Sequence, residues 1–84
     1  MFTMYILKSF KDGKLYIGST SNLRRRLVEH NSGLALATKG RRPLKLVYAE
    51  AYISEEEARH REHSLKTRGR ALRQLLLRIK QSVA

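Results

Sequence analysis

Residues 15–30 of this chain read LYIGSTSNLRRRLVEH. The pattern predicts the end of a strand, a polar turn over residues 19–22, and a basic helix that begins at Leu23. Ser21 or Asn22 is expected to cap this helix, because a side-chain oxygen there accepts a hydrogen bond from a free backbone N–H. A tyrosine, an arginine and a histidine occur in the stretch at spacings that could bring them together on one phosphate.

The helix expected after this turn has one face that should pack on a sheet. At about 100° per residue, Leu23, Leu27 and His30 share that face. Arg26 is the only one of three consecutive arginines that lies next to it, and it stands four residues before His30 along one edge of the helix. The remaining two arginines are expected to form a solvated basic surface: Arg24 and Arg25.

The residues before this stretch predict a β-hairpin. Residues 2–9 favour a strand, since Phe, Thr, Tyr and Ile are interleaved there. Residues 14–18 are expected to form the returning strand. Asp12-Gly13 lies between the two and is a strong turn signal, because glycine tolerates a positive φ.

The hairpin would place two tyrosines on one face of the sheet. With Asp12-Gly13 as a two-residue loop, Leu7 faces Gly18, and the alternation of side chains puts Tyr5 and Tyr16 on the same side. The opposite face takes apolar residues that suit a core: Met4, Ile6, Leu15 and Ile17. A register shift of two would bring the tyrosines closer, whereas a shift of one would separate them. The hairpin alone leaves open that both are ordinary strand aromatics.

The second half of the chain predicts a loop over residues 34–43, a third strand over residues 44–52, and two helices. Ser54, with Glu57 three residues later, forms a capping box at the start of the first of these helices. Thr67-Arg68-Gly69 should end it. Residues 70–80 then form a helix whose core stripe has the expected spacing: Leu72, Leu75, Leu76 and Ile79.

Glu62 is the one acid that is expected on the apolar side of its helix. It stands with Ala58 and Leu65 at helical spacing, so the carboxylate lies on an apolar stripe. A charge buried there is costly unless it is paired or binds a metal ion. A salt bridge to a basic neighbour such as Arg26 and the ligation of a metal ion are both open.

The composition indicates one small domain over residues 1–84 with a polyanionic partner. The chain has no Cys and a formal net charge of +11, which is typical first of proteins that bind nucleic acid and second of those that bind acidic membranes. No apolar run approaches the ~20 residues of a membrane-spanning helix, and the N-terminus lacks the features of a signal peptide. We therefore expect a cytoplasmic protein without membrane association.

Several cations are candidates for contact with nucleic acid. The segment from Lys39 to Pro43 groups three of them around a glycine and could grip a phosphate backbone, although it could also be an exposed turn. The residues expected to contact nucleic acid are Arg24, Arg25, Lys39, Arg41, Arg42, Lys66 and Arg68.

The outline of hairpin, helix, strand and two helices carries Thr3-Met4-Tyr5 and then Tyr16-Ile17-Gly18. The basic helix and Glu62 follow. This order resembles the GIY-YIG nuclease superfamily, and most of all its small free-standing branch, the one-domain bacterial UPF0213 or YhbQ-like proteins. The similarity runs from about Phe2 to Ile79. It implies an α+β fold in which helices flank a three-stranded antiparallel sheet, the GIY-YIG endonuclease fold.

The resemblance also implies a phosphodiesterase site that uses one divalent metal ion, Mg²⁺ or Mn²⁺. Tyr16 would take a proton from the attacking water, and Tyr5 would orient Tyr16 or the water. Arg26 would pair with the phosphate oxygens. His30 would accept a proton from Tyr16 or hold it, and Glu62 would bind the metal ion, a Lewis acid for the phosphate.

The sequence departs from the family pattern in two ways. The first motif lacks its glycine, and no asparagine follows Glu62, where Lys66 or Gln74 could take its position. Two functions therefore stay open. One is a metal-dependent DNA endonuclease that serves DNA repair or processes branched, damaged or single-stranded DNA. The other is a basic nucleic-acid-binding module with weak or no cleavage. A protein partner or a homodimer could supply specificity, and RNA is a further possible substrate.

Overall fold

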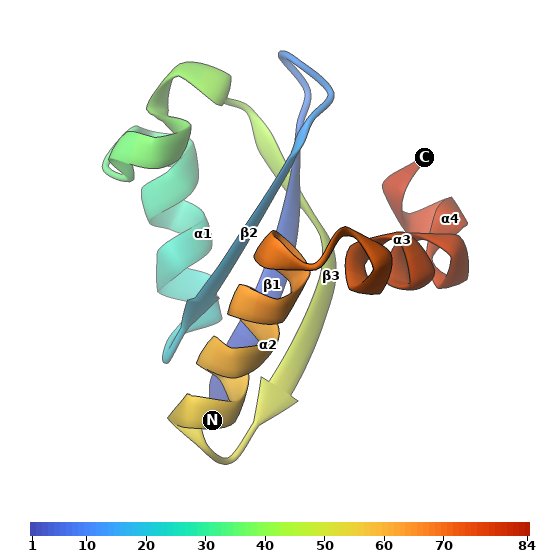
Figure 1. Cartoon of the computed structure of the whole chain (residues 1–84). Coiled ribbons are helices and arrows are strands. Elements are labelled where there is room, and N and C mark those ends of the chain that lie inside the picture. Colours follow the sequence, from blue (N-terminus) through green and yellow to red (C-terminus); the bar gives the residue numbers. More distant parts are fainter.

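The computed structural model of the chain describes all 84 residues. Its centre is a three-stranded antiparallel sheet in the order β2-β1-β3 (Figure 1). The strands are β1 (Phe2–Ser9), β2 (Leu15–Thr20) and β3 (Leu44–Tyr52). The helices are α1 (Leu23–Ser32), the 3₁₀ helix η1 (Leu36–Arg41), α2 (Glu55–Thr67), α3 (Gly69–Arg78) and α4 (Lys80–Val83). Helices thus flank the sheet, and the predicted fold class is confirmed.

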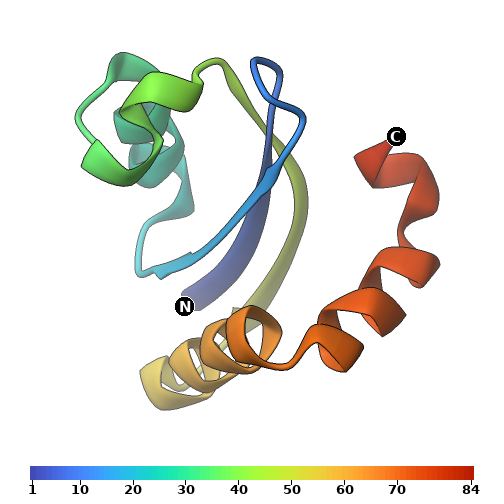
Figure 2. The same cartoon turned by 45° about the horizontal axis from the view of Figure 1, so that its top comes forward.

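The two faces of the sheet have the contents that alternation predicted. On one face Tyr5 and Leu7 pack with Leu23 and Leu27 of α1. The other face buries an apolar cluster against α2 and α3: Met4, Ile6, Ile17, Leu65 and Leu75. Figures 1 and 2 show α1 and η1 on one side of the sheet and α2 and α3 on the other. The tyrosine face and the core face are therefore on opposite sides.

The predicted two-residue loop of the hairpin is wrong. Leu7 pairs with Tyr16 and Tyr5 pairs with Gly18, which is a shift of two residues from the expected register. The physical reason is the buried Ser9, whose hydroxyl oxygen accepts hydrogen bonds from the backbone N–H groups of Lys11 and Asp12. These bonds stabilise a longer turn, and the faces stay unchanged because the shift is even.

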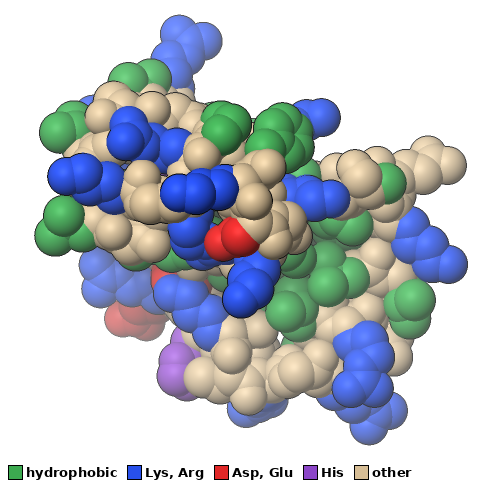
Figure 3. Space-filling model, turned by 90° about the horizontal axis from the view of Figure 1, so that it is seen from above, with side chains coloured by type: hydrophobic (Ala, Val, Ile, Leu, Met, Phe, Trp, Pro, Cys, Tyr) green, Lys and Arg blue, Asp and Glu red, His purple; other side chains and the backbone are tan.

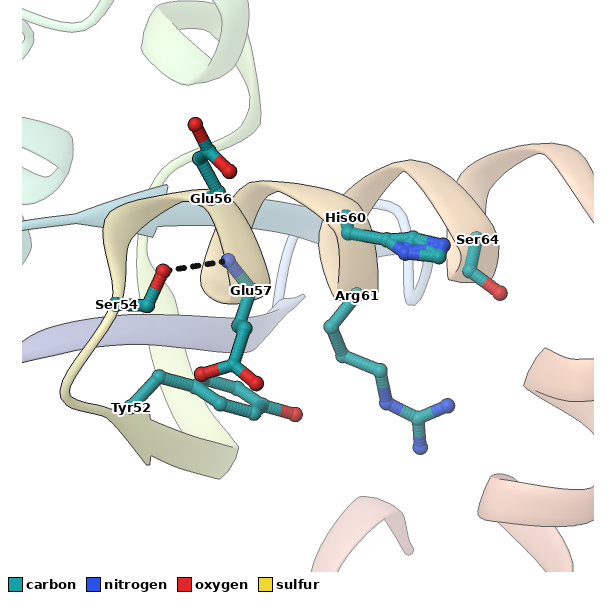
Figure 4. A pocket seen from close by; sticks show the side chains of 7 residues that line it. All are labelled: Tyr52, Ser54, Glu56, Glu57, His60, Arg61 and Ser64. Carbon is teal, nitrogen blue, oxygen red and sulfur yellow. Dashed lines mark hydrogen bonds between the residues drawn. The ribbon is translucent and has the colours of Figure 1, made fainter.

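The helix ends follow their local signals. Asn22 caps α1 by accepting a hydrogen bond from the backbone N–H of Arg25, and Gly33 ends α1 with a φ of 87°. Ser54 caps α2 in the same way, since its hydroxyl accepts from the N–H of Glu57 (Figure 4). The bounds of β3 and the break after Thr67 are as predicted.

Two predicted segments differ from the structure. The loop expected over residues 34–43 contains the helix η1, which is held by a buried contact of Thr38 that no local propensity reveals. The last helix begins at Gly69 and stops at Arg78, and the short α4 follows. No helix in the structure has the length and apolar character that a membrane crossing requires.

A network around Glu50 fixes α2 on the sheet. The Glu50 carboxylate accepts hydrogen bonds from the hydroxyls of Tyr48 (2.7 Å) and Tyr52 (2.5 Å) and from both Nε and Nη2 of Arg61 on α2. Figure 4 shows Tyr52 and Arg61 pointing to the same side of α2. Because Glu62 follows Arg61 directly, this network also sets where Glu62 stands.

Candidate active site

A buried chain of three side chains links β1, α1 and η1. The Tyr5 hydroxyl lies 2.8 Å from Nε2 of His30, and Nδ1 of His30 lies 2.6 Å from the hydroxyl of Thr38. Burial, with a smaller contribution from the nearby charge of Arg26, lowers the pKa of His30. The imidazole is therefore neutral near pH 7 and holds the Tyr5 hydroxyl in one position.

Tyr16 lies beside the hydrogen-bonded series of Tyr5, His30 and Thr38 without being hydrogen-bonded to any of them. Its ring centroid is 6.5 Å from that of Tyr5 and 5.1 Å from that of His30, which meets it edge-on. We expected His30 to act on Tyr16, but both ring nitrogens of His30 are engaged elsewhere. The structure thus assigns His30 to Tyr5 and leaves the hydroxyl of Tyr16 available.

Gly18 lets the two tyrosines approach each other. A Cβ atom on Gly18 would lie 2.6 Å from the Tyr5 hydroxyl oxygen and 3.2 Å from a ring carbon of Tyr16. The first of these contacts is impossible without movement of a side chain that is 1% exposed. The glycine of the second motif is therefore a packing requirement of the tyrosine pair.

Arg26 reaches toward Tyr5 from the edge of α1, as helical geometry predicted. Its Nη1 donates to Oε1 of Glu29 at 2.9 Å, and 35% of its side chain is exposed. Burial raises the pKa of Tyr5, and the guanidinium of Arg26 opposes that rise. Arg26 thus keeps part of its guanidinium open to a ligand while it lies next to Tyr5.

Glu62 lies at the edge of β2 with its two carboxylate oxygens divided between two donors. Ser19 donates to Oε1 at 2.5 Å, and the Lys66 ammonium donates to Oε2 at 2.5 Å. The suggested partner Arg26 is wrong, because Lys66 supplies the salt bridge. The Nζ atom of Lys66 also stands 5.9 Å from the ring centroid of Tyr16. Glu62, Lys66 and Tyr16 therefore form one group.

The donor set around Glu62 suits only one kind of metal ion. No group of three or more His, Cys, Asp or Glu side chains is placed to hold a metal. A site with one carboxylate needs an ion that keeps most of its water and binds phosphate, as Mg²⁺ does. The side chain of Glu62 is 22% exposed and that of Lys66 is 44% exposed, so a hydrated ion fits beside the carboxylate if the lysine yields Oε2.

The cations that were expected to contact nucleic acid are spread over the molecule. Arg24 and Arg25 are exposed on α1, and Arg68 is exposed at the junction of α2 and α3. Arg41 is occupied, because its Nε donates to Asp12 at 3.0 Å and its Nη2 to the Leu15 carbonyl. The remaining ones have other surroundings: Lys66 pairs with Glu62, while Lys39 and Arg42 line a groove beside η1.

Sequence reasoning missed Ser19 and Thr38. Ser19 directly follows the second motif, and strand alternation puts it on the side of α2, so its place was readable. Thr38 lies in a segment that was expected to be a loop, and nothing local marks it.

The hollow in Figure 4, with a volume of about 530 Å³, lies between β3 and α2 and contains none of the predicted site residues.

Comparison with known proteins agrees with the fold described above. The model of the GIY-YIG catalytic domain matches residues 1–75. A UPF0213 protein of Streptococcus pneumoniae is 48% identical over 68 residues, which are 80% of this chain and 68% of that protein. A UPF0213 protein of the archaeon Natronomonas pharaonis is 41% identical over 75 residues, 88% of this chain and 87% of that one.

A solved structure is also similar. The solution NMR structure of a UPF0213 protein from Bacillus halodurans has a TM-score of 0.57 and 37% sequence identity, and the match covers 94% of this chain and 87% of that one. Sequence, sheet order and the tyrosine face with its flanking glycine lead to one conclusion. The chain belongs to the family of GIY-YIG catalytic domains and is similar over most of its length to UPF0213 proteins.

Proposed function

We propose that the protein is a metal-dependent DNA endonuclease that hydrolyses phosphodiester bonds at the edge of β2. The observation that carries this proposal is the group formed by Tyr16, Lys66 and Glu62, together with Arg26, which lies at Tyr5 on the same face as Tyr16. It combines a free phenol, cations for phosphate oxygens and one carboxylate for a hydrated metal ion. The family is one of catalytic domains of nuclease type, which supports the same chemistry.

The side chains of this chain would share the work as follows. Tyr16, whose hydroxyl has no protein partner, would first release its own proton to solvent and would then, as the phenolate, accept a proton from the attacking water. Arg26 would bind the phosphoryl oxygens through the open part of its fork. His30 would fix Tyr5 so that its hydroxyl orients the water or Tyr16. An Mg²⁺ or Mn²⁺ ion held by Glu62 would supply Lewis-acid stabilisation of the charge on the phosphate.

Cleavage assays test the proposal. Labelled duplex, branched, damaged and single-stranded DNA, and one RNA, would be incubated with Mg²⁺ or Mn²⁺ and with EDTA. We expect product only with metal, and losses of about 10²–10⁴-fold for Tyr16→Phe and for Glu62→Ala. Wild-type rates in both variants would contradict the assignment. Lys80→Gln, at an exposed position of α4, is the matched control.

A second function is favoured by one contact. The Lys66 ammonium sits on the carboxylate oxygen that a metal ion would need, and no asparagine follows Glu62 to help. This arrangement also suits a nucleic-acid-binding module with little cleavage. Tight binding of DNA in EDTA without any product in Mg²⁺ or Mn²⁺ would favour this second function.

A further inference from the structure

A cationic groove lies at the end of the molecule that holds the β1–β2 turn and η1 (Figure 1). Its volume is about 550 Å³, and it is lined by Lys11, Asn31, Lys39, Gly40, Arg42 and Pro43. No acidic side chain lines it. Figure 3 looks down on this end and shows Lys and Arg side chains spread over it. None of the proposed catalytic residues belongs to the groove.

The three cations of the groove come from separate parts of the fold. Lys11 belongs to the hairpin turn, Lys39 to η1, and Arg42 to the segment that leads into β3. The acids of the chain form their salt bridges with other cations: Arg25, Arg26, Arg41, Arg59, Arg61 and Lys66. The charges of the groove are therefore uncompensated by the protein.

Asp12 is the acid nearest to Lys11 in the sequence, and its charge is already balanced. Its Oδ2 accepts from Nε of Arg41 at 3.0 Å. A backbone N–H of Lys14 also donates to Oδ1 of Asp12 at 2.9 Å, and these bonds lower the pKa of Asp12. Arg41 thus serves to neutralise the turn, and the groove keeps three positive charges.

Arg42 is held in place before any ligand arrives. Its Nε donates to the carbonyl of Lys39 at 3.0 Å, and its guanidinium covers Gly33, where a Cβ would lie 2.9 Å from Nη1. Gly33 ends α1, so the guanidinium stands near the helix C-terminus, which favours a cation. The terminal nitrogens make no hydrogen bond to the protein and remain free to donate.

We propose that this groove is a second phosphate-binding site, which binds the nucleic-acid backbone at a point distant from the bond that is cut. Three exposed and uncompensated cations fit a polyanion, because each neutralised phosphate releases counterions. An arginine that is fixed through Nε presents its terminal N–H groups to phosphate oxygens. The proposal rests on the proposed function, and it adds an anchoring contact that the catalytic group does not contain.

Binding in EDTA tests the groove separately from cleavage. The affinity for a labelled single-stranded DNA oligonucleotide would be measured over a range of salt concentrations for the wild type and for K11Q/K39Q/R42Q. The matched control is R70Q/R73Q/K80Q, which removes the same charge from exposed positions of α3 and α4. The slope of log Kobs against log salt is negative, and we expect the groove variant to reduce its magnitude by about 2, which is about 0.7 for each lost contact. The control should keep a slope close to that of the wild type.

The outcomes separate this proposal from the proposed function. Equal slopes for the two variants would overturn the groove, because only the general charge would then matter. Saturation of the groove by inorganic phosphate, with an unchanged DNA slope in the groove variant, would make it a site for small anions and would also overturn the proposal. Absence of cleavage, together with a slope of smaller magnitude in the groove variant, would contradict the nuclease and support the groove. Melting curves for both variants confirm that they fold.

Discussion

At the residue scale, the carboxylate of Glu62 decides how the candidate site can work. One oxygen is taken by Ser19 and the other by the Lys66 ammonium. A metal ion would therefore compete with an internal cation for Oε2. The lysine balances the charge of the carboxylate, and its Nζ atom stands 5.9 Å from the ring centroid of Tyr16.

Replacing Lys66 with Gln should therefore raise the affinity for Mn²⁺. A partly exposed ion pair contributes up to about 1 kcal/mol, so the gain should be about two- to fivefold. The measurement is an electron paramagnetic resonance titration of free Mn²⁺, without substrate. Lys80→Gln, which makes the same change in net charge on α4, should leave the affinity as it is. Weaker binding by the Lys66 variant would show that the lysine orients Glu62 for the metal.

At the scale of elements, the important contact is that of α2 with β3. Burial alone would raise the pKa of Glu50, but the hydrogen bonds from Arg61, Tyr52 and Tyr48 outweigh it and lower that pKa. Burial and the hydrogen bond to Glu50 raise the pKa of Tyr52 to about 12. These groups connect the helix that carries Glu62 to an outer strand of the sheet.

The pH dependence of stability follows from the sign of these shifts. The pKa of Tyr52 is higher in the folded protein than in the unfolded chain, whose value is 10.0. Its contribution is therefore present in full below pH 10 and is lost as the pH rises toward 12. The shift of Glu50 has the opposite sign, so its contribution is lost as the pH falls below about 4.5.

Replacing Glu50 with Gln should lower the pKa of Tyr52 toward 10, because the carboxylate that disfavours the phenolate is gone. The variant should also unfold more easily, by about 1–3 kcal/mol, since Arg61 loses a charged partner. Carbon-13 NMR of labelled tyrosine gives the pKa, and urea unfolding gives the stability. Glu56→Gln, on the exposed side of α2, is the control. An unchanged Tyr52 titration would mean that burial alone causes the shift.

At the scale of the whole molecule, the excess of positive charge works against folding. The formal net charge is +11 in 84 residues, and self-repulsion of this kind destabilises a compact state. In the proposed function, the same charge attracts the polyanionic substrate. In the proposed function, the catalytic group and the cationic groove would each contact a different part of that polyanion.

Added salt should therefore stabilise the protein. Raising NaCl from about 0.01 M to about 0.15 M shortens the screening distance from about 30 Å to about 8 Å. We expect the melting temperature to rise by a few degrees, as measured by circular dichroism. K11Q/K39Q/R42Q should show a smaller rise, because it carries less charge. A fall in the melting temperature with salt would show that the ion pairs outweigh the repulsion.

Local signals were enough for the bounds of most elements. Asn22 and Gly33 mark the ends of α1, and Ser54 marks the start of α2, because capping depends on side chains next to the backbone groups they satisfy. Strand alternation placed Tyr5 and Tyr16 on one face, and the helical period selected Arg26 from three arginines. These features repeat over a few residues, so the sequence predicts them without knowledge of the fold.

By itself, then, the sequence determined the family, the fold class and the tyrosine face, and it proposed candidate site residues without their contacts. The tertiary structure decided which of them meet. Lys66 rather than Arg26 pairs with Glu62, and His30 bonds Tyr5 and Thr38 rather than Tyr16. It also joined Lys11 to Lys39 and Arg42 in one groove. Such pairings depend on how helices and turns distant in the chain pack on the sheet, and no local period or cap carries that information.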